Sequence, residues 1–304
     1  MSKIILAGGS GYLGSALANY FKNQFTDIII LSRESKKSSG NIRTILWDAK
    51  NFDTWTKEID GADVLINLTG KSVDCRYTEK NKTLIYSSRL HSTKILGVAI
   101  LQSTNPPKLW INASSATIYK ASYDKSMTEA DGETGDDFSM NVCTQWEAEF
   151  IKYQTPETRK VILRTAIVLG KGGGAFIPLK NLVRLGLGGA QGSGKQYFSW
   201  LHEYDFCSIV EWVISNPTAS GVYNVSSPNP VRNMAFMKSL REATKVKFGM
   251  PLPTWLLKFG AALIGTETEL VLKSRNVIPD RLTHAGFLFK FPTLEKAFYD
   301  LLKK

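Results

Sequence analysis

The sequence contains few of the residues that build disulfides and metal sites. Among its 304 residues are only three cysteines and three histidines. These six are Cys75, Cys143, Cys207, His91, His202 and His284. Because they form neither a pair motif nor a metal-ligand spacing, we expect no disulfide framework and no metal site. Scattered cysteines in odd number are typical of proteins in a reducing cytoplasm.

Long apolar runs are also missing. The longest candidate, residues 254–264, is too short to cross a bilayer and contains Lys258. The first seven residues lead directly into a glycine-rich turn, whereas a signal peptide needs a longer apolar core and a cleavage site. We therefore expect a cytoplasmic protein that does not associate with membranes.

The positive charge is not concentrated. The formal net charge is +11, but the tightest basic clusters are the pairs 36–37 and 303–304. Nucleic-acid binding needs basic residues gathered on one face. We therefore expect no nucleic-acid partner and favour a small-molecule substrate.

Short apolar runs alternate with helical patterns in the first half of the chain. The runs cover residues 4–7, 28–31, 42–46, 62–68, 109–113 and 161–164. Such strands predict a doubly wound parallel α/β sheet, a Rossmann fold, covered on both faces. After residue 170 the chain is glycine-rich and then mixed, with helices predicted at 205–214 and 233–244 and around Trp255, and a strand at 222–225. We expect a Rossmann domain over residues 1–170 and a smaller C-terminal α/β cap over 171–304, partly interleaved with it.

A glycine motif lies between the first predicted strand and the first predicted helix, at residues 12–22. Gly8, Gly11 and Gly14 permit a tight turn and a close approach of the backbone to a pyrophosphate, which the helix N-terminus then attracts. A purely structural turn is the alternative. The predicted contacts in this loop are Gly8, Ser10, Gly11, Tyr12, Leu13 and Gly14.

The end of the second predicted strand favours NADP over NAD. An acidic residue there would bind the ribose hydroxyls of NAD, but this chain has Ser32 and Arg33, which suit a 2′-phosphate. The alternative is that Arg33 is an ordinary surface residue. Asp48 is expected near the adenine, and the segment 67–70, with Gly70, near the adjoining ribose.

The segment Ser114 to Tyr119 resembles the serine segment of sugar-nucleotide epimerases in the extended short-chain dehydrogenase/reductase superfamily. The resemblance gives Ser115 the active serine position, with a strand-end cap as the alternative. Nearly the whole chain is similar to an atypical, epimerase-like subfamily with a C-terminal domain of unknown function, through motifs at 67–70, 164–170, 199–202 and 277–282. This similarity implies NADP contacts at Ser32, Arg33, Leu68, Thr69, Arg89 and Ile167.

The chain departs from the superfamily at the acid/base pair. The superfamily uses Tyr-x-x-x-Lys about 25 residues beyond the serine, where the lysine lowers the tyrosine pKa. The window 140–146 holds neither residue, and the single match to the spacing, Tyr299 with Lys303, lies in the terminal helix. The candidate substitutes are Tyr119, Tyr123, Cys143, Glu147 and His202. We favour Tyr119 because it follows Ser115 on the same turn.

A second departure concerns the substrate. Phe198 occupies the position where epimerases of nucleotide sugars carry an arginine for the substrate diphosphate, which makes a nucleotide sugar doubtful. We expect an NADP-dependent oxidoreductase or epimerase-like enzyme that transfers hydride with a small hydroxyl or carbonyl compound, Ser115 polarising the oxygen. The alternative is a non-catalytic NADP-binding sensor or interaction protein.

Overall fold

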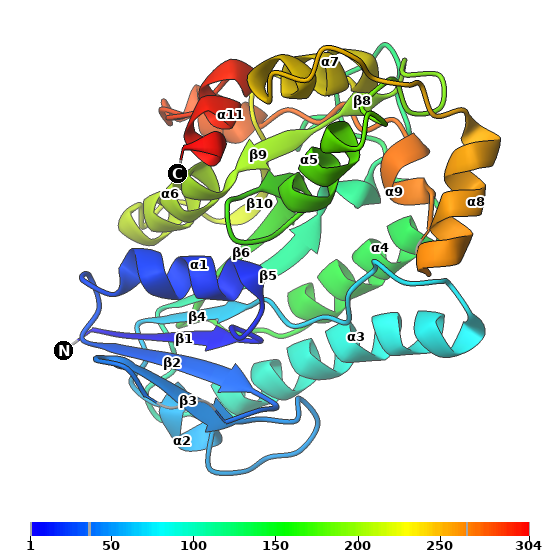
Figure 1. The fold of residues 1–304 in the computed structure, drawn as a ribbon. Helices are drawn as coiled ribbons and strands as arrows, with labels where there is room; N and C mark the ends of the chain where they lie inside the picture. Colours follow the sequence, from blue (N-terminus) through cyan, green and yellow to red (C-terminus); the bar gives the residue numbers. More distant parts are fainter. Residues whose placement is uncertain (1, 36–37, 266, 304) are drawn as a thin grey trace.

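The chain forms a parallel β-sheet with helices on both faces (Figure 1). The computed structural model describes residues 2–35, 38–265 and 267–303. Within them, seven strands pair in the order β10-β6-β5-β4-β1-β2-β3, and every pairing is parallel. The strands are β1 (Lys3–Ala7), β2 (Asp27–Ser32), β3 (Ile42–Leu46), β4 (Val64–Asn67), β5 (Leu109–Ser115), β6 (Arg159–Thr165) and β10 (Gly221–Val225). The predicted doubly wound α/β fold is confirmed.

The apolar composition of the strands follows from their burial on two faces. Along β1, Ile4 and Leu6 belong to one hydrophobic core, whereas Ile5 and Ala7 belong to the core on the opposite face. Successive side chains of a strand point to opposite faces, so a strand with a core on each side is apolar at every position. The order of connection reverses at β1, which pairs with both β2 and β4. Open α/β sheets bind ligands at the carboxyl ends of strands beside such a reversal.

Two groups of helices cover the sheet. Leu17 of α1 and Phe206 of α6 pack into the core that holds Ile4. Ile95 of α3 and Phe150 of α4 pack into the core on the other face. None of the helices in the described part of the chain is long and apolar enough to cross a membrane. The covering helices are α1 (Tyr12–Phe21), α2 (Thr56–Ile59), α3 (Glu79–Gln102), α4 (Phe138–Ile151) and α6 (Glu203–Ser215).

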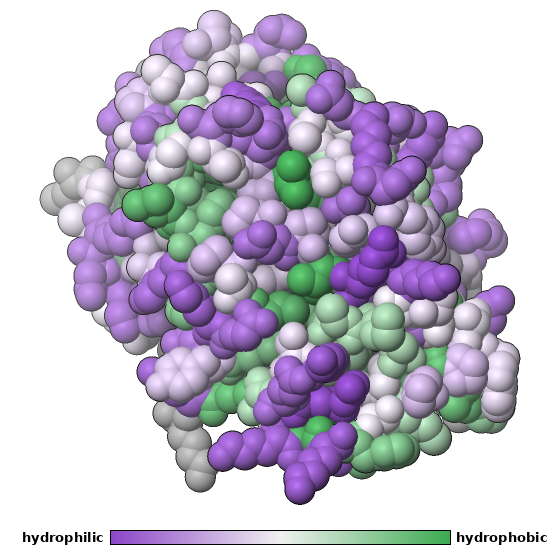
Figure 2. Space-filling model, turned by 90° about the horizontal axis from the view of Figure 1, so that it is seen from above, coloured by the Kyte–Doolittle hydropathy of each residue, from purple (hydrophilic) through white to green (hydrophobic). Residues whose placement is uncertain are grey.

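A third core lies above the sheet, around Phe176, Phe236 and Phe298. Figure 2 views the face that carries α7 and α11, where hydrophilic side chains cover most of the surface and hydrophobic areas are smaller. The remaining elements are β7 (Ile167–Leu169), β8 (Tyr197–Phe198), β9 (Trp200–His202), β11 (Val231–Arg232), α5 (Phe176–Arg184), α7 (Asn233–Ala243), α8 (Thr254–Ile264), α9 (Glu269–Leu272), α10 (Asp280–His284) and α11 (Leu294–Leu302), while a 3₁₀ turn, η1 (Ala116–Ile118), follows β5.

The second half of the chain returns to the first. β10 extends the main sheet by pairing with β6, and α6 covers the sheet beside α1. Asp205 of α6 then holds the C-terminal segment, because its carboxylate accepts hydrogen bonds from the backbone N–H groups of Lys290 and Phe291, both at 2.9 Å. The domain boundary at residue 170 stays a prediction.

Two helices differ from the sequence prediction. The 24-residue α3 is not predicted, because its first half is polar and its second half apolar, so no continuous stripe marks it. The start of α4 is not predicted either. This helix begins at Phe138 after an N-cap in which Asp137 accepts a hydrogen bond from the Met140 N–H. The acid/base candidates Cys143 and Glu147 both lie inside this helix.

Candidate functional site

Two glycines of the first loop are required by the packing of the protein itself. Gly8 follows β1 with φ +73°, and a Cβ there would lie 2.8 Å from the Thr69 Oγ1. A Cβ on Gly14 would lie 2.3 Å from the Gly9 Cα. The first glycine therefore permits the turn, and the second permits close packing of α1 on the loop.

Gly11 is different. Its φ of −77° suits any residue, and a Cβ there would meet only the Gly8 carbonyl oxygen, at an ordinary 3.8 Å. Gly11 caps α1 without a side-chain hydrogen bond, and the first bond that it accepts comes from the Ser15 N–H at 2.9 Å. The N–H groups of the first turn, residues 12–14, precede that bond and point out of the helix start. The space in front of them suits an anion.

The Tyr12 side chain packs against the glycine-rich loop that follows β7. Its hydroxyl donates to the Glu203 Oε2 at 2.5 Å, and burial, with Glu203 second, raises its pKa. A Cβ on Gly170 would lie 1.4 Å from the Tyr12 hydroxyl oxygen, and one on Gly173 would lie 2.5 Å from its ring. These glycines make room for Tyr12, so a contact of Tyr12 with a cofactor falls to its backbone.

The turn after β4 presents a hydroxyl beside Gly8. The buried Asn67 donates to the Asn112 Oδ1 at 2.8 Å and to the Thr93 Oγ1 at 3.1 Å, and its own oxygen accepts from the Thr69 N–H at 3.1 Å. The Thr69 Oγ1 is buried, and no described residue forms a hydrogen bond with it. Thr69 is thus fixed through its backbone while its hydroxyl is available to a ligand.

Arg89 shapes the same turn from α3. Its Nη1 donates to the carbonyls of Lys71 and Ile85 at 3.1 and 3.0 Å, and its guanidinium lies over the Trp146 ring, 5.1 Å from the centroid. A Cβ on Gly70 would lie 2.9 Å from the Arg89 Cζ. Burial lowers the pKa of Arg89, but a guanidinium keeps its proton in proteins, so Arg89 carries a positive charge.

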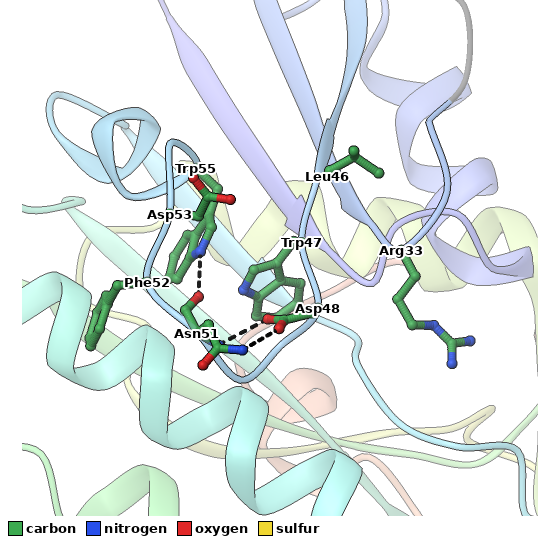
Figure 3. A pocket seen from close by; sticks show the side chains of 8 residues that line it. All are labelled: Arg33, Leu46, Trp47, Asp48, Asn51, Phe52, Asp53 and Trp55. Atoms are coloured by element: carbon green, nitrogen blue, oxygen red, sulfur yellow. Dashed lines mark hydrogen bonds between the residues drawn. The ribbon is translucent and has the colours of Figure 1, made fainter.

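Arg33 and Asp48 meet at one cavity of about 360 Å³ at the ends of β2 and β3 (Figure 3). Arg33 is exposed, and Figure 3 shows its guanidinium directed away from Asp48. Asp48 accepts from the N–H groups of Lys50 and Asn51, which lowers its pKa. Ser32 precedes Arg33, is buried, and accepts from the Glu34 N–H at 3.2 Å. The cavity lining is Arg33, Leu46, Trp47, Asp48, Asn51, Phe52, Asp53 and Trp55.

Ser115 ends β5 and is partly exposed. Its hydroxyl donates to the Thr117 Oγ1 at 3.0 Å and accepts from the Thr117 N–H at 3.2 Å. The Thr117 Oγ1 also accepts from the Arg275 Nε at 3.3 Å. The sequence patterns do not single out Thr117 or Arg275, because 158 residues separate them and only the fold brings them together. Ile167, partly exposed at the start of β7, pairs with Trp200.

Tyr119 lies in a buried network rather than at an open site. Its hydroxyl donates to the Asn224 Oδ1 at 2.9 Å and accepts from the Arg164 Nη1 at 2.7 Å. Arg164 in turn pairs with Glu147, which also accepts from the Ser114 hydroxyl. Burial raises the pKa of Tyr119. This geometry does not favour Tyr119 as a proton donor, and its catalytic role stays a prediction.

The other acid/base candidates are also unfavourable. Tyr123 is 50% exposed, on the surface. Cys143 is buried, and burial raises the pKa of its thiol to about 12, so the thiol is uncharged at neutral pH. Glu147 is already held by Arg164 at 2.7 Å. The surface position of Tyr123, the uncharged thiol of Cys143 and the ion pair of Glu147 do not favour these residues for proton transfer.

His202 has a structural place. Its Nδ1 accepts from the Tyr204 N–H at 3.0 Å and caps α6, its Nε2 lies 3.5 Å from the Asp300 Oδ2, and its ring stacks on Phe291. Burial lowers its pKa to about 4, although Asp300 works in the other direction. The imidazole is therefore neutral at physiological pH.

Comparison with known proteins relates the whole chain to one family. Residues 4–226 match the family model described as NAD dependent epimerase/dehydratase family, and residues 252–301 match a domain of unknown function. An epimerase family protein of Staphylococcus haemolyticus is 32% identical over 304 residues, which cover 99% of each chain.

Solved structures agree with this relation. The crystal structure of the human epimerase family protein SDR39U1 (isoform 2) with NADPH has a TM-score of 0.87 and 30% identity, over 98% of each chain. The nucleoside-diphosphate sugar epimerase of Corynebacterium glutamicum has a TM-score of 0.78 and 28% identity, over 99% of this chain and 57% of its own.

We predict that His202 makes the fold less stable in mild acid. Between pH 6.5 and about 4 the unfolded chain binds a proton at His202 and the folded chain does not, so stability falls as the pH falls through that window. The loss at pH 4 amounts to at most about 3 kcal/mol. Denaturant unfolding at several pH values measures it, and His202→Asn, which retains a capping oxygen, should flatten the slope. An unchanged slope in the variant would contradict this assignment.

Proposed function

Since the chain belongs to the NAD dependent epimerase/dehydratase family, we propose that it is an NADP-dependent, epimerase-like oxidoreductase acting on a small hydroxyl or carbonyl compound. The predicted membership of the epimerase-like subfamily with a C-terminal domain of unknown function is confirmed by both family models. Membership of this family and the similar NADPH-bound structure support an NAD(P)-dependent enzyme that acts on a small molecule. The choice of NADP, the hydride transfer and the site residues are our proposal. The cytoplasmic location stays a prediction.

The open start of α1 carries the proposal. The first-turn N–H groups, the unfilled space at Gly11 and the unpartnered Thr69 hydroxyl all face the carboxyl ends of β1 and β4. The helix start has no side-chain cap, and the packing of the protein does not require a glycine at residue 11. Such a helix start suits a pyrophosphate. The proposed contacts are Gly8, Ser10, Gly11, Tyr12, Leu13, Gly14, Leu68, Thr69, Gly70, Arg89 and Ile167.

Arg33 supports NADP. It is exposed beside the cavity that follows β2 and β3, and the preceding position holds Ser32 rather than an acidic residue. A guanidinium and a hydroxyl bind a 2′-phosphate by charge-assisted hydrogen bonds. Asp48, which also lines this cavity, is proposed near the adenine. The similar human protein was solved with NADPH.

The residues around Ser115 provide the substrate side. A bound nicotinamide would supply or accept the hydride. The Ser115 hydroxyl donates to the Thr117 Oγ1, and rotation of this hydroxyl would let it donate to a substrate oxygen instead. The Thr117 Oγ1 would then keep the hydrogen bond that it accepts from Arg275. Donation to the oxygen on which negative charge develops stabilises the transition state.

A second function is favoured by the missing acid/base pair. Tyr119 and His202 are both held in structural contacts, and the Cys143 thiol has a pKa of about 12. A chain that binds NADP without turnover, as a sensor or interaction protein, would need no residue that titrates near neutral pH. Catalysis and sensing differ in whether bound coenzyme is consumed.

We predict that the protein oxidises NADPH in a single turnover with a carbonyl compound and that Ser115→Ala slows this step about a hundredfold. Absorbance of the reduced nicotinamide, followed against a panel of ketones and aldehydes, measures it. Ser220→Ala is the control, because Ser220 is exposed just before the start of β10. Tight NADPH binding with no oxidation on any substrate would favour the sensor.

We predict opposite effects for two glycines of one loop. Gly11→Ala should lower the unfolding midpoint of the free protein only slightly, because alanine is a poorer N-cap than glycine. It should weaken NADPH binding about tenfold, and Gly11→Val should abolish binding, because the added atoms fill the space of the pyrophosphate. Gly14→Ala should destabilise the fold by roughly 1–3 kcal/mol, because its Cβ meets Gly9. Calorimetric titration and thermal unfolding separate the two. Full NADPH affinity in Gly11→Val would exclude this loop.

We predict that Arg33→Asp reverses the coenzyme preference, weakening NADPH about tenfold or more relative to NADH. The ratio of the two dissociation constants is the measurement, since it cancels any general loss of binding. Lys94→Asp makes the same change of charge at an exposed position of α3. An unchanged ratio in Arg33→Asp removes Arg33 from the 2′-phosphate site.

A further inference from the structure

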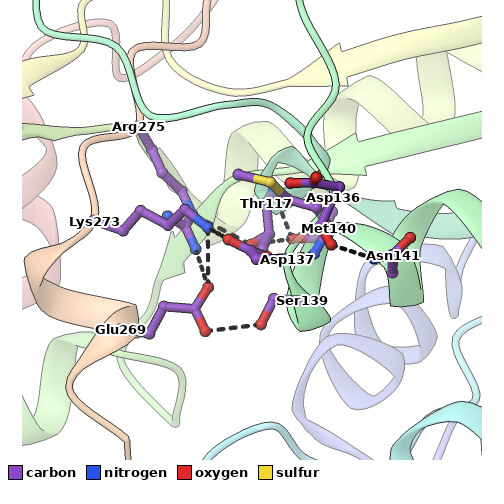
Figure 4. Close-up of polar contacts among 10 residues, drawn as sticks. Thr117, Asp136, Asp137, Ser139, Met140, Asn141, Glu269, Lys273 and Arg275 are labelled. Atoms are coloured by element: carbon purple, nitrogen blue, oxygen red, sulfur yellow. Dashed lines mark hydrogen bonds and ion pairs between the residues drawn. The ribbon is translucent and has the colours of Figure 1, made fainter.

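A buried arginine from the C-terminal segment reaches the Ser115 loop (Figure 4). Arg275 is 9% exposed, and its Nε donates to the Thr117 Oγ1 at 3.3 Å. The same Thr117 oxygen accepts from the Ser115 hydroxyl at 3.0 Å. One hydroxyl therefore joins the serine of the proposed substrate site to a cation that enters from α9 and the segment after it.

Most of this guanidinium lacks a close acceptor. The Nη1 is buried, and no described residue accepts a hydrogen bond from it. The Nη2 lies 3.7 Å from the Glu269 Oε1, too far for a hydrogen bond. An arginine has five N–H donors and keeps its charge, so burying it without an acceptor is unfavourable. The free edge of Arg275 thus calls for an oxygen acceptor that the described chain does not supply.

Glu269 is the nearest carboxylate, and it is shared. Its Oε1 also lies 3.3 Å from the Lys273 Nζ, and its Oε2 accepts from the Ser139 hydroxyl at 3.0 Å. Lys273 additionally forms an ion pair with Asp137. Figure 4 shows Glu269, Lys273 and Arg275 converging on the side chains of α4 and its N-cap. Glu269 is therefore a loose partner of Arg275 with other partners of its own.

A second buried cation, Arg89, lies near the same group of residues. Arg89 and Arg275 both lie within electrostatic reach of Cys143 and of Tyr77, and each favours the ionised form of Cys143. Cys143 stays uncharged nevertheless, because burial dominates. The uncharged thiol therefore gives neither guanidinium a counter-charge, and Glu269 is the one carboxylate among the described residues within ion-pair distance of Arg275. Arg275 also stands beside Phe198, where an arginine for a diphosphate is missing, since its backbone N–H donates to the Tyr197 carbonyl at 2.9 Å.

We propose that Arg275 binds an oxyanion of the substrate, a carboxylate or a phosphate, beside Ser115, so that the substrate is an anionic hydroxy or keto compound. The inference rests on the proposed function, because it assigns the class of substrate that binds at Ser115. A planar guanidinium with a free edge matches an oxyanion by charge-assisted hydrogen bonds. The anion would take the place beside Arg275 that Glu269 approaches only to 3.7 Å.

The test is titration calorimetry of the NADPH-loaded protein with three probes. Oxalate and malonate represent a carboxylate, and inorganic phosphate represents a phosphate, so the arm that binds identifies the source of the oxyanion. We expect saturable binding in at least one arm. Arg275→Gln should weaken it about tenfold or more, Arg275→Lys should restore part of it, and the NADPH dissociation constant should not change.

A second variant should change the oxyanion affinity in the opposite direction. Glu269→Gln removes the competing carboxylate, and we expect oxyanion binding to tighten several-fold, which loss of a merely structural contact would not cause. Lys195→Gln, which removes a charge at an exposed position, is the control and should have no effect. If Arg275→Gln does not fold, Glu269→Gln and Arg275→Lys decide.

The outcomes separate this inference from the function on which it rests. Absence of NADPH binding to the wild-type protein contradicts the proposed function. Normal NADPH binding with no oxyanion binding in any arm overturns the anion site alone. Equal oxyanion affinity in wild type and Arg275→Gln, or weaker affinity in Glu269→Gln, overturns it as well.

Discussion

The rest of the site depends on a helix start that the protein surrounds but does not satisfy. Gly8 and Gly14 are fitted against Thr69 and Gly9, and Tyr12 fills the room left by the glycines after β7. These contacts pack the start of α1 tightly, yet no side chain caps it. A Ser or Asp cap would accept a hydrogen bond from one of the first-turn N–H groups and stabilise the helix. Without such a cap, the helix start is suited to an external anion.

A buried polar network joins the end of β4 and β5 to the helices beneath. Asn67 and Asn112 bind each other, and Thr93 receives the indole N–H of Trp146 at 2.9 Å. Further along α4, Glu147 pairs with Arg164. The superfamily resemblance places a tyrosine and a lysine on α4. In this chain α4 instead carries Trp146 and Glu147, whose side chains bond to α3 and β6. Removing one partner of a buried ion pair is costly, so Glu147 is held in place by Arg164 and by the Ser114 hydroxyl.

Local pattern predicts the sheet and the glycine loop because both depend on near neighbours. Strands buried on both faces are apolar at every position, and the glycines stand between strand and helix. The sequence favours Tyr119 because it lies close to Ser115 along the chain, but in the fold its side chain is buried against Arg164. Arg275 carries no local signal at all. Its relation to Thr117 exists only after folding, and no periodicity or spacing reports such a contact.

The C-terminal segment fixes Arg275 through its backbone rather than its side chain. The Arg275 N–H donates to the Tyr197 carbonyl at 2.9 Å, its own carbonyl accepts from the Ser199 hydroxyl at 2.7 Å, and the Val277 N–H donates to the same hydroxyl at 2.8 Å. The segment thus lies along the residues that flank Phe198. Because main-chain bonds set its position, the guanidinium keeps only the hydrogen bond from its Nε to Thr117, and its Nη1 has no acceptor among the described residues. The chain lacks an arginine at 198, yet the neighbouring segment brings a positive charge to Thr117, two residues from Ser115.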